Sequence, residues 1–396
     1  MTEPLYDIAI IGGGPVGAAL ALALRDSGLQ ICVLEARAEH VTSQDARALA
    51  LSYGSRLLLQ RLNVWNELHD VSPIRTIHIS QQKSFGRAVL QAAQLDVPEL
   101  GYVLPYPALQ DALALAIAGA GEVRTYYGAR VTELRGETDH AVIRYQPTDT
   151  GLIGAHDGER SVHARLAVVA DGGRLLAALH PPEVRDYGQS ALITHITCSA
   201  PNAHTAYERF TPQGPLALLP FKDGYELVWT APHQTTQEML AWNDARFLRE
   251  LQRHFGDRVG EFLSAGKRSC FALGLKRAPQ QSPQPHIVLL GNAAQTLHPV
   301  AGQGFNLGLR DAWELAQEII AAAPQTLGTP AMLDAYRKQR RTDREAGIRF
   351  TDGLVRLFSN DMPLLSTGRA AALTALDCLP FAKKFVAKRM MFGANG

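Results

Sequence analysis

The sequence predicts a mixed α/β fold made of more than one packed unit, and three observations support this prediction. The chain of 396 residues is roughly two to three times as long as a typical domain. Its content of 46% hydrophobic and 19% charged residues is ordinary for a globular protein and unlike that of a disordered chain. Near the N-terminus a strand, a glycine cluster, a helix and a second strand follow in the order of a Rossmann-like unit. A small binding module is therefore excluded.

The N-terminal unit begins with a strand over 5–11, followed by a helix over 16–27 and a second strand over 29–34. Three glycines in the pattern GxGxxG join the first strand to the helix. They would allow a tight turn, the approach of a pyrophosphate and close packing of the helix on the sheet. An acidic residue after the second strand would accept hydrogen bonds from a ribose. The residues predicted to bind a dinucleotide here are Gly12, Gly14, Pro15, Gly17, Glu35 and Ala36.

Two later strands also run directly into glycine-rich turns. The strand over 166–170 ends in Asp171-Gly172-Gly173, and the strand over 287–290 leads into a segment with four glycines before Leu309. So much glycine between a strand and a helix that begins near Phe305 indicates that the backbone closely approaches a bound group.

The remaining segments predict a second, sheet-based unit and a helical C-terminus. Strand-like runs at 216–221 and 225–230 precede a helical run over 236–255, and the chain from Asp334 onward is mostly helical. The stretch 379–392 combines four cations with Phe and Met. It predicts either a helix packed on the body or one lying on an anionic bilayer.

Charge and cysteine content exclude several functions. Lys and Arg total 39 against 38 for Asp and Glu, so we expect no nucleic-acid partner. The cysteines lack metal-ligand or CxxC spacing, which predicts reduced thiols, no metal and a cytoplasmic location. Glycines and a proline interrupt the apolar run over 8–24, and no basic residue precedes it. It therefore predicts neither a signal peptide nor a membrane span.

These motifs together resemble a known family. GxGxxG, Asp-Gly after a strand and the segment GNAAQTLHPVAGQGFNLGLRD from Gly291 are similar to the single-component FAD-dependent aromatic hydroxylases of the para-hydroxybenzoate hydroxylase type. Further segments most resemble the ubiquinone-biosynthesis branch of this family, above all the 2-octaprenyl-6-methoxyphenol hydroxylases. They are the sequence RALAL from Arg47, the sequence GPLALLP from Gly214, and the residues Tyr336, Arg340 and Asp343. One departure is Asn292, where the family usually has Asp; an amide still donates and accepts hydrogen bonds.

The resemblance implies a set of site residues. Arg47 and Gln110 would contact FAD, although a surface ion pair and a plain polar helix face are the alternatives for them. His298 would face the pocket or serve a structural role. Further FAD-binding residues implied are Asp171, Gly172, Gly291, Asn292, Gly304, Phe305 and Asn306. The residues expected to line the reacting flavin ring and support catalysis are His298, Pro299, Gly302, Gln303 and Gly304.

The resemblance also implies a domain organisation. It predicts a Rossmann-like FAD-binding domain over 1–75, 100–180 and 272–335, a β-sheet substrate domain over 76–99 and 181–271, and a C-terminal helical region over 336–396.

The implied activity is hydroxylation of a polyprenylphenol, 2-polyprenyl-6-methoxyphenol, to the benzoquinol in ubiquinone biosynthesis. NAD(P)H would reduce FAD, and O2 would form a C4a-hydroperoxide that transfers oxygen to the ring. Other ubiquinone-biosynthesis proteins and the inner face of the cytoplasmic membrane, reached through the C-terminal region, are the expected partners. The alternatives are a hydroxylase of a small soluble phenol and a flavin-binding scaffold of a biosynthetic complex.

Overall fold

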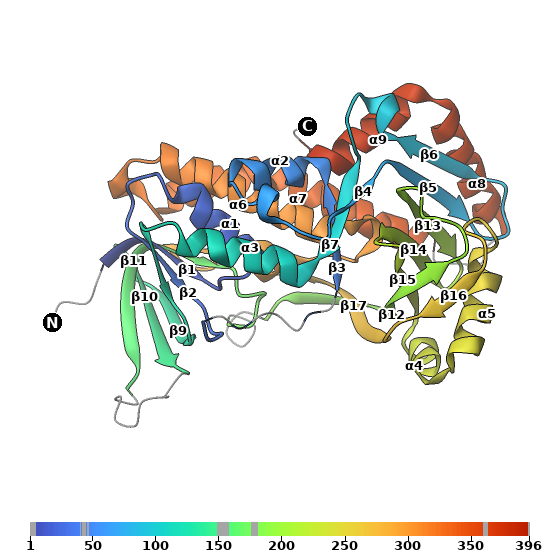
Figure 1. Cartoon of the computed structure of the whole chain (residues 1–396). Helices are drawn as coiled ribbons and strands as arrows, with labels where there is room; N and C mark the ends of the chain where they lie inside the picture. Colours follow the sequence, from blue (N-terminus) through green and yellow to red (C-terminus); the bar gives the residue numbers. More distant parts are fainter. Residues whose placement is uncertain are drawn as a thin grey trace.

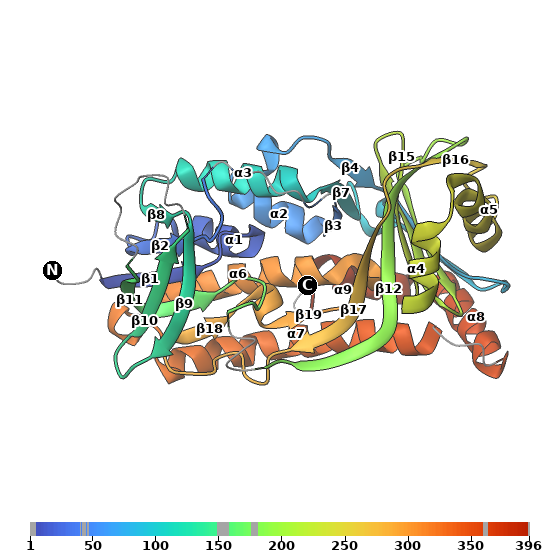
Figure 2. The same cartoon turned by 90° about the horizontal axis from the view of Figure 1, so that it is seen from below.

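A computed structural model describes residues 5–39, 41, 45, 47–148, 158–175, 181–358 and 363–394. Two large β-sheets lie at opposite ends of an elongated molecule, and a small sheet lies between them (Figure 1). Seen from below, two long helices run lengthwise from the first large sheet toward the second (Figure 2). The mixed α/β fold class predicted from the sequence is confirmed.

The first large sheet contains the N-terminal Rossmann-like unit. Its strands are β8 (Val123–Tyr126), β2 (Ile31–Leu34), β1 (Leu5–Ile11), β11 (Arg160–Val169), β10 (Ala141–Pro147), β9 (Ala129–Gly136) and β18 (Ile287–Leu289). Strands β8, β2, β1, β11 and β18 pair in parallel. Strand β11 changes partners along its length, because residues up to Ala164 pair with β10 and residues from Ala167 pair with β18. All five parallel strands therefore bring their carboxyl ends to one edge, where ligands bind in such sheets.

The second large sheet is antiparallel except where β13 pairs with β5. Its strands are β19 (Gln295–Thr296), β17 (Ser269–Arg277), β12 (Glu183–Cys198), β15 (Gly224–Pro232), β14 (Gly214–Phe221), β13 (Thr205–Thr211), β5 (Thr76–Gln81), β6 (Arg87–Gln91) and β16 (Phe262–Ala265). Strands β17 and β19 link it to the segment that carries β18. The small sheet between the two contains β3 (Ala48–Ser52), β7 (Gly101–Pro105) and β4 (Ser72–Ile74).

Nine α-helices occur in the described part of the chain. They are α1 (Pro15–Leu24), α2 (Tyr53–Arg61), α3 (Tyr106–Ala118), α4 (His233–Ala241), α5 (Asp244–Phe255), α6 (Gln303–Ala321), α7 (Pro330–Phe358), α8 (Pro363–Cys378) and α9 (Pro380–Phe392). Short 3₁₀ turns there are η1 (Trp65–Glu67), η2 (Ala92–Leu95), η3 (Gly291–Ala293), η4 (Val300–Gly302) and η5 (Pro324–Thr326). The helical run expected over 236–255 is two helices, because Asn243 caps α5 by accepting a hydrogen bond from the backbone N–H of Arg246.

Each large sheet has its own apolar core. Helices α1, α3 and α6 cover one face of the first sheet, with Ile8, Leu20 and Leu309 fully or nearly fully buried. Helices α4 and α5 cover one face of the second sheet, where Trp229 and Phe247 are buried. On the opposite face of the second sheet, Phe210 of β13 packs with Val300 of η4, Val355 of α7 and Leu373 of α8.

A buried charge network holds α7 on α6. The Arg340 guanidinium, 1% exposed, donates from Nε to Asp311 at 2.8 Å and from Nη2 to Asp343 at 2.6 Å. Arg310 and the backbone N–H of Ala394 also donate to Asp343. Burial opposes ionisation of Asp343, but Arg310 and Arg340 hold its pKa below the ordinary value. This network fixes the C-terminal end of the chain on the long helices.

Candidate active site

The turn between β1 and α1 has the shape that the GxGxxG pattern predicts. Gly12 has a φ of +103°, and a Cβ there would lie 2.8 Å from the Ala170 carbonyl oxygen. A Cβ on Gly17 would lie 2.1 Å from the Gly12 carbonyl oxygen, so α1 packs too closely for any side chain. Around Gly14, in contrast, nothing lies within 4 Å of an added Cβ. The turn therefore leaves open space at Gly14, directly before the N-terminus of α1, as an anion site requires.

Glu35 lies at the end of β2, directly beside this turn, and Ala36 after it is exposed. The Glu35 carboxylate accepts four hydrogen bonds, from the backbone N–H groups of Gly13 and Arg37 and from two nitrogens of the Arg37 guanidinium. Burial opposes ionisation, but these donors leave the pKa of Glu35 below its ordinary value. A ribose hydroxyl at Glu35 would have to replace the Arg37 side chain.

The two other glycine turns meet at the carboxyl ends of β11 and β18. Asp171 accepts hydrogen bonds from the backbone N–H groups of Gly173 and Leu175, which shapes its own turn. A Cβ on Gly173 would lie 3.3 Å from the carbonyl oxygen of Asn292. The two turns line one cavity of about 510 Å3 through Gly172, Gly173, Asn292, Ala293 and other residues. Gly291, with a φ of +57°, packs against Val16 of α1.

The predicted catalytic turn runs from exposed Pro299 through η4 into α6. Gly302 has a φ of +60°, and a Cβ on it would lie 3.1 Å from the Ala50 Cβ of β3. The Asn306 amide holds this contact through four hydrogen bonds within the protein. It accepts from the Ser52 N–H and the Ser55 hydroxyl and donates to the carbonyls of Ala50 and Gly302. Asn306 thus positions the turn, and any contact of residue 306 with a cofactor would come from its backbone.

The neighbouring turn residues differ in exposure. Gln303 is buried, and its amide nitrogen lies 3.5 Å from the Met390 carbonyl oxygen. Phe305 packs against the helix-covered core of the first sheet. Beside Gly304 the nearest atom to an added Cβ is 3.9 Å away. The backbone at the start of α6 is therefore accessible to a flat group.

His298 is 1% exposed and lies edge-on to Tyr187 with ring centroids 5.3 Å apart. Its Nδ1 accepts a hydrogen bond from the Val300 N–H at 3.1 Å, so the ring proton is on Nε2. Within the described residues this Nε2 has no partner. Burial lowers the pKa of His298 to about 4. The ring is therefore neutral at physiological pH and presents one unused N–H donor.

Gln110 and Arg47 lie on adjoining elements. Gln110 is 5% exposed on α3, and its Oε1 has no hydrogen-bond partner among the described residues. Arg47 pairs with Asp45, and its guanidinium lies 5.2 Å from the ring centroid of Phe271 on β17. The hydrogen bond with Asp45 raises the pKa of Arg47. Its carbonyl accepts from the N–H of Tyr106 at the start of α3. Arg47 thus spans the junction between the two sheets.

These features fit a bound dinucleotide. A dinucleotide would fit the open space beside Gly14 and Gly304. It could also satisfy the buried polar atoms of Gln110 and His298, which have no partner among the described residues. In the part of the chain that the structure describes, no group of acidic, histidine or cysteine side chains is arranged to hold a metal ion. The individual contacts assigned to FAD from the sequence stay predictions.

Three residues near the site were not predicted from the sequence. Arg37 covers Glu35, Tyr187 contacts His298, and Glu208 lies on the second sheet. Of these, only Glu208 left a local signal, since a charged pair Glu208-Arg209 in the middle of a strand is unusual. The other two contacts depend on side-chain directions that no motif encodes.

Comparison with known proteins gives a consistent result. The FAD-binding-domain family model matches residues 5–351. The ubiquinone hydroxylase UbiL of Rhodospirillum rubrum is 31% identical over 98% of this chain and 90% of that protein. The 3-demethoxyubiquinol 3-hydroxylase of Escherichia coli is 30% identical over 95% of this chain and 96% of its own length.

Solved structures share the fold. The p-nitrophenol 4-monooxygenase PnpA of Pseudomonas putida superposes with a TM-score of 0.78 at 17% identity, covering 99% of this chain and all of that one. PqsL of Pseudomonas aeruginosa has a TM-score of 0.75 at 20% identity, with 94% of this chain and all of that chain covered.

Fold, glycine turns and family match together define an FAD-dependent monooxygenase. FAD is the cofactor, and NAD(P)H and O2 are the cosubstrates typical of such enzymes. More narrowly, the chain belongs to the family of FAD-dependent hydroxylases that includes the ubiquinone-biosynthesis hydroxylases. The resemblance recognised from the sequence is thereby confirmed.

Proposed function

We propose that this protein hydroxylates the ring of a polyprenylphenol in ubiquinone biosynthesis, converting 2-polyprenyl-6-methoxyphenol to the corresponding benzoquinol. One observation carries the proposal: the apolar face of the second sheet packs directly on the predicted catalytic turn. Phe210 of β13 and Ala88 of β6 share a buried cluster with Val300 of η4 and Val355 of α7. An apolar ring and its prenyl tail would find apolar surroundings beside the flavin there. The names of two relatives, a ubiquinone hydroxylase at 31% identity and a 3-demethoxyubiquinol 3-hydroxylase at 30% identity, agree with this substrate class.

The protein's own residues would bind, orient and exclude water. FAD, reduced by NAD(P)H, supplies the chemistry of O2 activation and ring hydroxylation when bound. The α1 turn at Gly14 would hold its pyrophosphate, and the Gly302–Gly304 backbone would lie against its ring system. The neutral His298 would donate from Nε2 to an acceptor in the pocket. The cluster around Val300 and Phe210 would keep water from the reacting groups.

The experiment that tests this proposal compares lipid extracts of the native cell with and without the protein, by mass spectrometry. We expect a prenylphenol one hydroxyl group short of the quinone to accumulate, and the purified protein to show flavin absorbance. Its mass and fragmentation would identify the ring position. A normal quinone pool would overturn the proposal in favour of a soluble phenol, and flavin without phenol-dependent NAD(P)H oxidation would favour the scaffold reading.

We further propose that the protein docks on an anionic membrane surface through α8 and α9. No helix within the described ranges is long and apolar enough to cross a bilayer. Helix α9 exposes 72% of Phe381 and 61% of Phe385 beside Lys384 and Lys388, whereas Ala387 and Met391 on its other side are buried. Exposed aromatic rings between cations suit insertion among anionic headgroups.

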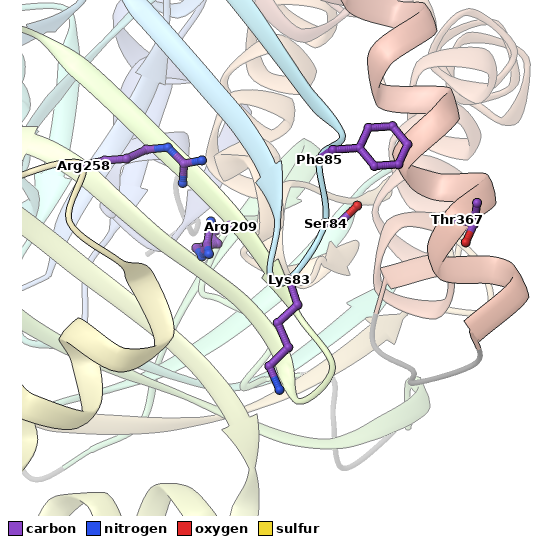
Figure 3. A pocket seen from close by; sticks show the side chains of 6 residues that line it. All are labelled: Lys83, Ser84, Phe85, Arg209, Arg258 and Thr367. Atoms are coloured by element: carbon purple, nitrogen blue, oxygen red, sulfur yellow. The ribbon is translucent and has the colours of Figure 1, made fainter.

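A cationic pocket at the other end of α8 supports the same orientation. Its volume is about 520 Å3, and Lys83, Ser84, Phe85, Arg209, Arg258 and Thr367 line it (Figure 3). Phe85, 74% exposed, lies at the β5–β6 turn next to α8 (Figure 3). Lys83 and Arg258 make no ion pair within the described residues, so their charges are available to headgroup phosphates.

Point variants test membrane docking better than truncation, because Ala394 is hydrogen-bonded to Asp343 and truncation would disturb the body. The double change Phe381→Asp and Phe385→Asp should reduce cosedimentation with phosphatidylglycerol vesicles about 10-fold or more. Ile320→Asp, at a 51% exposed position on α6, is the matched control and should leave binding unchanged. Equal binding of all three proteins would overturn the docking proposal.

A further inference from the structure

Glu208 lies in the middle of β13 in the second sheet and points away from α4 and α5, the helices that cover one face of that sheet. Its neighbours on β13 face α5: the Tyr207 ring lies 5.4 Å from that of Phe255, and Arg209 Nε donates to the His254 carbonyl. Successive side chains of a strand point to opposite faces. The Glu208 carboxyl therefore lies on the face of the sheet that points away from α5. In the neighbouring strands Glu208 pairs with Ala217 of β14 and Ile79 of β5.

This face is apolar and borders the catalytic turn. Phe210, two residues after Glu208 on β13, belongs to the apolar cluster that contains Val300 of η4. Ala206, two residues before Glu208, belongs to a cluster with Val103 of β7. Ile79 also packs against the Val300 cluster. Glu208 is therefore a carboxyl placed between two apolar clusters, and one of these includes the turn expected beside the flavin.

No group in the described part of the chain neutralises this carboxyl. Among the described residues Glu208 has no ion-pair or hydrogen-bond partner; the protein surrounds it closely, and its side chain keeps some accessible surface. Burial raises the pKa of Glu208 to about 7. An isolated carboxyl in apolar surroundings is costly unless a partner satisfies it. The missing partner is expected to be a donor that arrives with a ligand.

Other titratable groups near this face do not duplicate Glu208. Tyr187 and His298 flank the Val300 cluster; burial raises the pKa of Tyr187 to about 12 and lowers that of His298 to about 4. Asp352 is bound by Arg185 and by the Tyr187 hydroxyl. Farther along the same face, Glu226 pairs with His195 at 3.0 Å. Glu208 alone among these is an unpaired acceptor facing apolar surroundings.

We propose that Glu208 is the acceptor for the phenolic hydroxyl of the substrate, and that it takes this proton while the ring is hydroxylated. This inference rests on the proposed phenol substrate. O2 is the oxidant and NAD(P)H, acting through FAD, is the reductant: the O–O bond breaks, one oxygen atom bonds as a hydroxyl group to the carbon para to the phenolic hydroxyl, and the other leaves as water. As this C–O bond forms, the phenolic O–H bond breaks, its proton moves to the Glu208 carboxylate and the ring becomes a dienone. Loss of the proton on the new C–O carbon then restores aromaticity, and Glu208 returns its proton to the original oxygen. Glu208 is unchanged after the cycle, and its place fixes which ring carbon faces the flavin.

The first test measures binding without turnover. The holoprotein, without NAD(P)H, is titrated with 4-nitrophenol, whose phenol and phenolate forms absorb differently. Next to a carboxylate the bound probe should remain a neutral phenol at pH values where free 4-nitrophenol ionises. In Glu208→Gln this upward shift of the probe's pKa should disappear. An unchanged spectrum-against-pH curve in Glu208→Gln would overturn the proposal.

The second test measures turnover with a prenylphenol. Glu208→Gln should lower kcat about 100-fold, while the rate at which NAD(P)H reduces the flavin is less affected. Glu208→Leu should be equally inactive but no less stable to heat, because it removes an unpaired carboxyl from apolar surroundings. The matched control Glu226→Gln, on the same face, should keep kcat. Full activity in Glu208→Gln would refute the role of Glu208, whereas inactivity of the unaltered enzyme toward every prenylphenol would instead refute the proposed substrate.

Discussion

The cofactor side and the substrate side of this protein are both built on β-sheets, but they present their chemistry differently. On the cofactor side the backbone forms the binding surface, because Gly12, Gly14 and Gly302 lack side chains where space is needed. On the substrate side the side chains form the surface, which is apolar except for the carboxyl group of Glu208. Backbone recognition constrains residue type at fixed spacing, whereas recognition by a sheet face constrains only one side chain in two.

This difference teaches how the two sides would tolerate change. The glycine turns leave almost no freedom at particular positions, since an added Cβ at Gly17 meets backbone at 2.1 Å. The sheet face near Phe210 and Ile79 needs apolar volume more than particular residues. We therefore expect the cofactor side to be common to many substrates, and the sheet face to set which phenol enters.

The largest effect is expected where one network holds both sides together. Arg340→Met leaves Asp311 buried without its paired cation and removes one of the two guanidinium partners of Asp343, and it should lower the free energy of unfolding by about 3–5 kcal/mol. Thermal unfolding of the holoprotein measures this loss. The control Arg337→Met, which removes an exposed cation paired with Asp334 on the same helix, should change stability by less than about 1 kcal/mol. Comparable losses of unfolding free energy in both variants would show that the buried network stabilises the protein no more than an exposed ion pair does.

A second prediction separates packing from ligand approach within one turn. Gly17→Ala should destabilise the protein by about 1–3 kcal/mol, because its Cβ overlaps the Gly12 carbonyl oxygen. Gly14→Ala should leave stability within about 0.5 kcal/mol, because nothing lies within 4 Å of its Cβ. It should nevertheless weaken FAD binding about 10-fold, measured by flavin fluorescence. Normal FAD affinity in Gly14→Ala would place the pyrophosphate elsewhere.

The two sides also differ in how much the sequence could reveal. The β1–α1–β2 unit, both later glycine turns and the start of α6 within two residues followed from local patterns. The hydrogen bonds by which Asn306 holds β3 could not be predicted from local patterns. Three of its four partners, at residues 50, 52 and 55, are distant in sequence, and only residue 302 is close. Glu208 was missed for a related reason: its isolation arises from three elements that are distant in sequence. Local patterns report backbone conformation, whereas side-chain environments depend on the assembled fold.

His298 lies at the junction of the two sides and gives a pH-dependent prediction. Burial lowers its pKa to about 4, so the unfolded chain, with a histidine pKa of about 6.5, binds the proton first as the pH falls. Its contribution to stability is complete above about pH 6.5 and is lost toward about pH 4, by up to about 1.4 kcal/mol per pH unit. His298→Asn should flatten stability against pH over this range, measured by urea unfolding with excess FAD. The exposed His69 is the control, and an equal slope in both variants would contradict the buried neutral ring.

The smallest effect concerns the one place where the cofactor side depends on side chains. All four hydrogen bonds that Glu35 accepts come from Gly13 and Arg37. If the ribose of FAD uses this carboxylate, the partly exposed Arg37 guanidinium must leave first, at a cost of about 0.5–1 kcal/mol. Arg37→Gln should therefore raise FAD affinity about 2- to 5-fold by equilibrium titration, whereas Glu35→Gln should lower it. Arg135→Gln, at an exposed cation on β9, should change neither. A loss of affinity in Arg37→Gln would instead make Arg37 a direct ligand of the cofactor phosphates, and Glu35 the residue that positions it.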